Sequence, residues 1–214
     1  MARKPADQSV SPEDIISAAA DVLQHNGYEA TTMKDIAARV NLTAASLYHH
    51  FKNKDALLLA VLERGLELAY EQISAVANHP ELTAGEKLRE MARWHILNVT
   101  KNTTVGAAMV FEIRSLMSIK TAEVSGNGGR SEDDFIMRRD AFFTLRDKFE
   151  ALFRYTVREG TENGEFREVD AAIFAKMMLG AHNWVGVWYK DSGRLSGEEV
   201  ADMIAENFLM ALRK

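Results

Sequence analysis

Several features that often decide what a protein does are missing from this sequence. It contains no cysteine, which excludes disulfides and thiolate metal sites. Only three prolines interrupt its 214 residues and alternating β-branched positions are nearly absent, so the pattern predicts helices throughout. No apolar run approaches the roughly 20 residues of a membrane span, and the N-terminus lacks the apolar core of a signal peptide. We therefore expect an all-α, cytoplasmic protein that contacts no membrane.

An excess of positive charge is missing too. The formal net charge is -5, and the first 55 residues carry seven acidic side chains against six lysines and arginines. Any contact with nucleic acid must therefore depend on where a few cations are placed rather than on bulk charge.

Capping residues and apolar periodicity divide the chain into about nine expected helices. Ser11, Pro12 and Asp14 form the start of the first helix, which Gly27 ends; Thr31 or Thr32 caps the second and Thr43 the third. The later expected helices are 55–76, one that starts after Thr83, 105–117, 131–159, 169–189 and 196–212, with a mobile glycine-rich loop at 120–130. We expect two domains, 1–54 and 55–214.

The stretch "TTMKDIAARVNLTAASLYHHFKNKDALL" (31–58) contains two short helices joined by a turn, the geometry of a helix-turn-helix. Ala44, Ala45 and Ser46 are small enough to let the second helix approach base edges, and His49 offers a polar tip. Residues of the types that bind phosphate oxygens surround them: Thr32, Thr43, Tyr48, His50 and Lys54. The spacing alone leaves two interpretations open, a DNA-reading unit or a small three-helix bundle with a polar face.

Residues 11–58 resemble the DNA-binding domain of the TetR family of transcriptional repressors. "SLYHHFKNKDALL" is similar to that family's Leu-Tyr-x-His-Phe-x-x-Lys-x-x-Leu ending. The resemblance implies a double-stranded DNA operator as partner, with base or near-base contacts from Ala44, Ala45, Ser46 and His49. It implies phosphate contacts from Thr32, Thr43, Tyr48, His50 and Lys54. His49 stands where the family often has another aromatic residue, which bears on the operator sequence.

Beyond residue 60 the resemblance implies architecture: a helical ligand-binding and dimerisation domain whose last two helices form a four-helix interface in a homodimer. "MMLGAHNWVGVWYKDSGRLSGEEVADMI" (177–204) looks like the matching segment of the branch that regulates fatty-acid and steroid breakdown, whose ligands are acyl-CoA thioesters. These helices are apolar on more than one side, which favours an interface. The expected interface residues are Phe174, Met178, Ala181, Val185, Trp188, Val200, Ile204 and Phe208.

A small-molecule effector pocket is expected between the central helices, an apolar cavity with a few polar groups. Its candidate residues are Trp94, His95, Asn98, Met109, Phe111, Arg114, Met117, Phe142, Phe143 and Met177. Methionine and aromatic stripes at helical spacing are more often plain core than pocket. Arg114 either pairs with an acid such as Glu112 or meets an anionic ligand. The six histidines lack the spacing of a metal site, so no metal or cofactor is expected.

The sequence thus predicts a one-component regulator, most simply a repressor, that binds a palindromic operator as a homodimer and is released by a small molecule. An enzyme is disfavoured because no nucleophile–base pair, phosphate loop or metal triad is visible; "SGNGG" (125–129) does not follow a strand. The alternative is a helical scaffold that binds protein and does not read DNA.

Overall fold

A computed structural model describes residues 10–101 and 130–214 of the chain. These ranges contain helices and no strand, as the all-α prediction requires. The helices are α1 (Pro12–Ala30), α2 (Met33–Arg39), α3 (Ala44–His50), α4 (Lys54–Ala77), α5 (Ala84–Lys101), α8 (Arg130–Glu162), α9 (Ala171–Trp188) and α10 (Gly197–Leu212). The expected helix at 105–117 and nearly all of the expected loop at 120–130 lie outside the described residues.

Side-chain caps fix where the first three helices begin, at the predicted residues. At α1 the Asp14 amide donates to the Ser11 hydroxyl (3.1 Å), and the Ser11 amide donates to the Asp14 carboxylate (2.9 Å). Thr32 and Asp35 form the same reciprocal pair at α2. Thr43 caps α3. These bonds satisfy amides that a helix cannot pair internally, so the local sequence alone determines these starts.

Gly27 interrupts the first helix where the sequence predicted. It has a non-helical backbone with a φ of 76°, and a short second segment of α1 continues beyond this kink to Ala30. A glycine tolerates that conformation because it has no Cβ. The helix expected at 131–159 extends to Glu162, since nothing before Asn163 and Gly164 breaks its hydrogen bonding.

The chain divides into two compact units, residues 1–62 and 63–214. The division falls inside α4, eight residues beyond the expected boundary at 54/55. In the first unit α2 packs against both α1 and α3. The side chains of Ile15, Ile36 and Leu47, one from each helix, are fully buried or nearly so and form the centre of its core.

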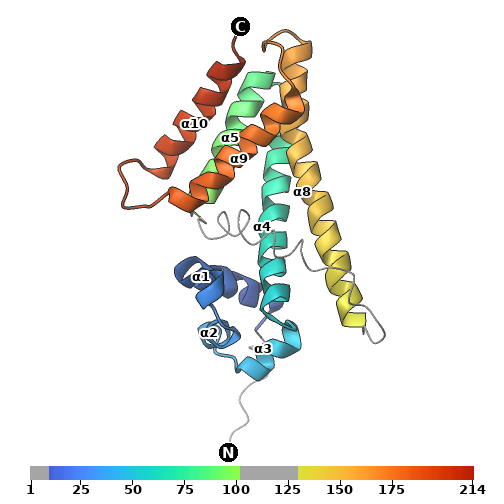
Figure 1. Cartoon of the computed structure of the whole chain (residues 1–214), viewed down its shortest axis with the longest axis vertical. Helices are drawn as coiled ribbons and strands as arrows, with labels where there is room; N and C mark the ends of the chain where they lie inside the picture. The colour runs from blue at the N-terminus through green and yellow to red at the C-terminus, as the bar shows by residue number, and fades with distance from the viewer. Residues whose placement is uncertain (1–9, 102–129) are drawn as a thin grey trace, which may run out of the picture. The chain divides into compact units, whose positions relative to one another are not determined.

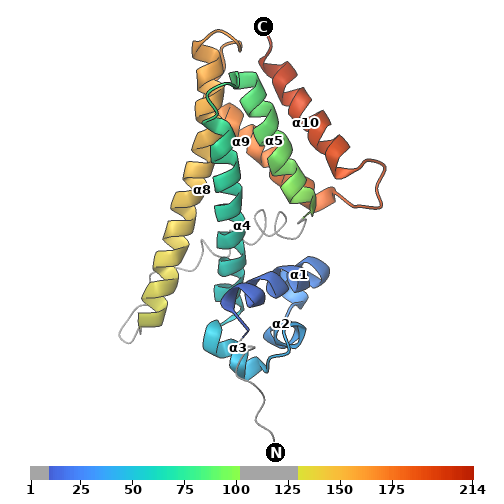
Figure 2. The same cartoon turned by 180° about the vertical axis from the view of Figure 1, so that it is seen from behind.

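In the second unit, α5 packs against α8, α9 and α10 (Figure 1). Figure 2 shows the same helices from behind, with α5 in front of α9. Ile96, Val185 and Ala201, one each from α5, α9 and α10, share a buried cluster. An ion pair between Lys87 and Glu159 (2.8 Å) joins α5 to α8. Among the described helices, none has the length and apolar character to span a membrane.

Candidate nucleic-acid interface and effector region

Helix α3 packs against the rest of the first unit through one of its faces. The Leu47 side chain is fully buried and Phe51, just after the helix, is nearly so. Ala45, Tyr48 and His49 are exposed and follow an i, i+3, i+4 pattern, which places them on one helix face. The tyrosine is 53% exposed although it is a large aromatic residue. The helix therefore presents a continuous face of small, aromatic and imidazole groups to solvent.

The remaining predicted base contacts lie at the first turn of α3. Ala44 and Ser46 are half-buried. The Ser46 hydroxyl lies 2.9 Å from the Thr43 hydroxyl, and the Ser46 amide donates to that same oxygen (3.1 Å). The cap thus fixes the direction of both hydroxyl groups at the end of the helix that would enter a groove.

The predicted phosphate-binding residues differ in whether their polar groups already bind another side chain. Tyr48 and His50 are exposed. Thr32 donates its hydroxyl proton to the Asp35 carboxylate (2.7 Å), and this bond lowers the pKa of Asp35. A phosphate contact by the Thr32 hydroxyl would require that bond to be exchanged.

Lys54, also predicted to contact phosphate, makes contacts that the sequence did not predict. Its ammonium donates to the main-chain carbonyl of Tyr28 (2.9 Å) and lies 4.1 Å from the centre of the Tyr28 ring. The Tyr28 hydroxyl donates in turn to the Asp55 carboxylate. These residues are 26 and 27 positions apart, so helical spacing offers no signal for either contact.

The predicted effector residues that the structure describes differ in burial. Trp94, Asn98 and Phe143 are half-buried, whereas His95 and Phe142 are buried. Met177 is 59% exposed, whereas Met178, one position on, is fully buried. The remaining candidates lie outside the described residues: Met109, Phe111, Arg114 and Met117.

His95 has a buried partner that the sequence did not predict, His182 of α9. Their Nδ1 atoms lie 3.3 Å apart, so one ring donates to the other. The rings of Phe149, Phe153 and Phe208 lie within about 6 Å of this pair. His182 Nε2 is buried and has no hydrogen-bond partner within the part of the chain that the structure describes. Burial lowers the pKa of His95 to about 4, and burial together with the charge of His95 lowers that of His182 well below 6.5.

These lowered pKa values predict a loss of stability in mild acid. In the unfolded chain both histidines return to a pKa near 6.5 and take up protons that the folded protein does not. The free energy of unfolding should therefore be fully retained above about pH 7. Between about pH 6.5 and 5 it should fall by up to roughly 1.4 kcal/mol per pH unit for each histidine. Urea unfolding at a series of pH values measures this slope.

A histidine variant and a matched control isolate the buried pair. His182→Phe should halve the slope between about pH 6.5 and 5, because one of the two groups no longer titrates. His49→Gln removes an exposed histidine and should leave the slope as in the wild type. An unchanged slope in the His182 variant would show that the pair does not govern acid stability.

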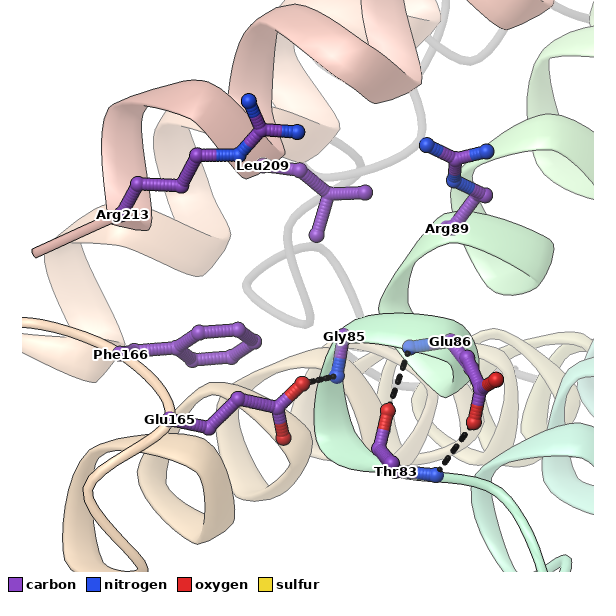
Figure 3. A pocket seen from close by; sticks show the side chains of 8 residues that line it. All are labelled: Thr83, Gly85, Glu86, Arg89, Glu165, Phe166, Leu209 and Arg213. Carbon is purple, nitrogen blue, oxygen red and sulfur yellow. Dashed lines mark hydrogen bonds between the residues drawn. The ribbon is translucent and has the colours of Figure 1, made fainter.

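A hollow of about 500 Å³ lies where the start of α5, the α8–α9 connection and the end of α10 meet. Figure 3 shows Arg89 and Arg213 on either side of Leu209, with Phe166 next to Glu165. Both arginines pair with the carboxylate of Glu206, and the Gly85 amide donates to Glu165 (2.9 Å). None of the predicted effector residues lines this hollow. Its arginines are thus already paired, and its carboxylates, Glu86 and Glu165, accept hydrogen bonds from the Thr83 and Gly85 amides.

The predicted dimer residues divide between the core and the surface. Four correct the prediction, since they are buried in the chain's own core and have little surface left for a partner: Phe174, Met178, Val185 and Val200. Ala181 and Trp188 are exposed, and Ile204 and Phe208 are half-buried. Of the interface residues expected on α9, Phe174, Met178 and Val185 thus lie on the inner face of that helix.

The opposite face of the last two helices carries the exposed apolar residues. On α9 they lie four, seven and four residues apart and are each about half exposed, and two more lie on α10. They are Ile173, Met177, Trp184 and Trp188 on α9 and Met203 and Met210 on α10. We call these six residues the α9–α10 outer face. So many large apolar side chains at the surface of one pair of helices indicate an interaction surface.

Within residues 10–101 and 130–214, no three histidine, aspartate or glutamate side chains come together as a metal site would require. The described residues thus present two features that can bind a partner: the exposed face of α3 and the α9–α10 outer face.

Comparison with known protein families matches both ends of the chain. Residues 15–61 match the model described as "Bacterial regulatory proteins, tetR family", and residues 137–212 match "Tetracyclin repressor-like, C-terminal domain". Together these matches cover more than half of the sequence. The HTH-type transcriptional repressor KstR2 of Mycolicibacterium smegmatis is 27% identical over 202 residues, which cover 92% of this chain and 87% of that protein.

Two solved structures extend the likeness. The TetR family regulator PfmR from Thermus thermophilus superposes with a TM-score of 0.74 at 28% identity, covering 94% of this chain and 99% of that one. AibR in complex with isovaleryl coenzyme A and operator DNA superposes with a TM-score of 0.71 at 28% identity, covering 94% and 97%. The residues of α2 and α3, the two family matches and these relatives agree: this chain belongs to the TetR family and is a DNA-binding regulator of transcription rather than an enzyme.

Proposed function

We propose that the protein is a one-component repressor that binds a palindromic operator as a homodimer and releases it when a small molecule binds residues 63–214. The observation that carries this proposal is the exposed face of α3. Ala45, Tyr48 and His49 are held outward by the buried Leu47, in the helix that a helix-turn-helix inserts into the major groove.

The base contacts in this proposal come from Ala44, Ala45, Ser46 and His49. Small side chains at the start of the helix allow close approach, methyl groups suit thymine, and the serine and imidazole offer hydrogen bonds. Phosphate contacts fix the register around them and come from Thr32, Thr43, Tyr48, His50 and Lys54. With a formal charge of -5 for the whole chain, such local contacts must supply the affinity.

The partner that we propose for the α9–α10 outer face is a second copy of this chain. A palindromic operator has two-fold symmetry, and a two-fold dimer places the same face of each copy against the other. Gly180 lies between Met177 and Trp184 on α9, and a Cβ added there would have no heavy atom of the described residues within 4 Å. The helix therefore leaves room at its centre for a partner helix to come close.

The effector that we propose is an acyl-CoA thioester. The structure of AibR was solved with isovaleryl coenzyme A and operator DNA, and AibR superposes on 94% of this chain. The protein would offer the buried aromatic residues Phe142 and Phe149 of α8 to an acyl chain, with His95 of α5 as a polar group nearby.

Release follows if the effector prefers a conformation in which the two recognition helices no longer match successive major grooves, roughly 34 Å apart. Helix α4 is the proposed lever, because it is one continuous helix that begins in the first unit and continues into the second. Within the second unit, Glu63 of α4 is paired with Arg138 of α8. A ligand that displaces α8 would therefore pull on α4.

Selection from fragmented genomic DNA tests the regulator proposal. Purified dimer should enrich a short palindrome over input DNA at physiological salt. Failure of a folded dimer to enrich any sequence, alone and with acyl-CoA present, would instead favour a helical scaffold that does not read DNA.

The effector proposal makes a separate prediction. We expect a matched acyl-CoA to weaken operator binding by about fivefold to 150-fold, the usual range of allosteric coupling. Fluorescence anisotropy of labelled operator measures this, across saturated acyl chains of increasing length. Free coenzyme A is the control, because it carries the nucleotide and the phosphates without the acyl group. Equal release by free coenzyme A, or no release by any thioester, would contradict the assignment.

A further inference from the structure

One tyrosine holds the first two residues of α4. The carbonyl oxygen of Tyr28 accepts a hydrogen bond from the Lys54 ammonium (2.9 Å), which also lies 4.1 Å from the centre of the tyrosine ring. The Tyr28 hydroxyl donates to the carboxylate of Asp55. Two consecutive side chains at the start of α4 are therefore bound by the main chain, the ring and the hydroxyl of a single residue. We call these three residues the Tyr28 clamp.

The clamp lies beside the start of α2. Tyr28 follows the kink at Gly27, and its carbonyl also accepts from the Thr31 amide (3.2 Å). The Thr31 hydroxyl donates to the carbonyl of Gly27 (2.6 Å), and its side chain is buried. Thr32, the next residue, caps α2. The clamp thus connects the segment that starts α2 with the segment that starts α4.

We propose that Tyr28 and Asp55 are positioning residues for operator binding. They fix the distance between two proposed phosphate-binding positions, Thr32 and Lys54, so that both meet the same DNA backbone in one register. This inference rests on the proposed function. It adds that the Lys54 ammonium is pre-oriented by the tyrosine, so part of its rotamer freedom is lost before DNA arrives. Such pre-orientation increases affinity without adding a contact.

The proposal can be tested by whether removing the Asp55 carboxylate raises or lowers the affinity for operator DNA. A carboxylate beside a phosphate backbone repels it, so on charge alone the removal of Asp55 should tighten DNA binding. If the carboxylate holds Tyr28, its removal should loosen the clamp and weaken binding. Charge and positioning therefore predict opposite outcomes for the same substitution.

The experiment compares four variants of the full-length protein on the operator recovered by selection, over a range of salt concentrations. Tyr28→Phe and Asp55→Ala should each lose roughly threefold to tenfold in affinity, the fold-change that one hydrogen bond supports. The salt dependence should stay as in the wild type, because no phosphate contact is removed. Lys54→Met should lose affinity and reduce the salt slope by about one contact. Glu29→Gln is the matched control: it removes an exposed negative charge next to Tyr28 and should bind as well as the wild type or tighter.

Stoichiometric titration gives the active fraction of each variant, and thermal unfolding shows whether the fold persists. Wild-type affinity in Tyr28→Phe, or tighter binding in Asp55→Ala that equals the gain in Glu29→Gln, overturns the clamp proposal while the regulator assignment stands. A loss that comes only from a smaller active fraction overturns it as well, because the role is then purely structural. A wild-type protein that binds no DNA contradicts the proposed function itself.

Discussion

Replacing Ala45 by glutamate should abolish operator binding and leave the fold intact. Ala45 is exposed on the outer face of α3, where we propose that it meets base edges. A carboxylate there would enter the major groove between the two phosphate backbones, and like charges placed so close cost several kcal/mol. We expect a loss on the order of a hundredfold or more in anisotropy titrations. The fold should not suffer, since an acidic side chain in the first turn of a helix favours the helix dipole.

Two controls separate the effect of the charge from the effects of side-chain size and of position in the protein. Ala45→Gln has the same size as the glutamate variant and no charge, so it should retain much more affinity. Ala75→Glu makes the same substitution at an exposed residue of α4 outside the proposed interface, and should bind like the wild type. Near-normal binding by the Ala45→Glu protein would mean that the exposed face of α3 does not read DNA.

The parts of the fold that the sequence predicted are those determined by short-range interactions. The Ser11–Asp14 and Thr32–Asp35 pairs lie three residues apart, so a capping box is visible in the sequence itself. The outward direction of Ala45, Tyr48 and His49 follows from the position of Leu47, the one large apolar residue inside α3. The all-α fold and the family were therefore predictable, and both are confirmed.

The parts that could not be predicted depend on contacts between distant residues. Nothing near Lys54 in the sequence shows that Tyr28 accepts its hydrogen bond. His182 meets His95 across 87 positions. A buried histidine without an i, i+4 partner resembles any other polar residue of a helix until the packing of α5 against α9 is known.

The buried face of helix α9 could not be predicted for a different reason. It has apolar residues on both faces, so periodicity cannot tell the core face from the outer one. Phe174, Met178 and Val185 fit a stripe at the same spacing as Ile173, Met177 and Trp184. Only the direction in which α5 and α8 pack decides which stripe is buried. For this reason Met177 was expected in the effector pocket and four core residues were expected at the interface.

Met177 therefore offers the second large effect: Met177→Glu should convert the dimer into a monomer. The side chain is 59% exposed, so the protomer should tolerate a carboxylate. In a dimer formed through the α9–α10 outer face, that carboxylate would be buried against apolar groups in both copies, which costs several kcal/mol per charge. Sedimentation velocity at micromolar concentration should show loss of the dimer. Operator affinity should fall by roughly a hundredfold or more, because two linked half-site contacts become one.

Met137→Glu is the matched control, because Met137 of α8 is 66% exposed and lies outside the α9–α10 outer face. That protein should stay dimeric and bind the full operator normally. A half-site oligonucleotide completes the argument, since monomeric Met177→Glu should bind it as well as the wild-type protomer does, which shows that α3 is intact. A Met177→Glu protein that stays dimeric but no longer responds to acyl-CoA would support the pocket position expected from the sequence, and would exclude the outer face of α9 from the dimer.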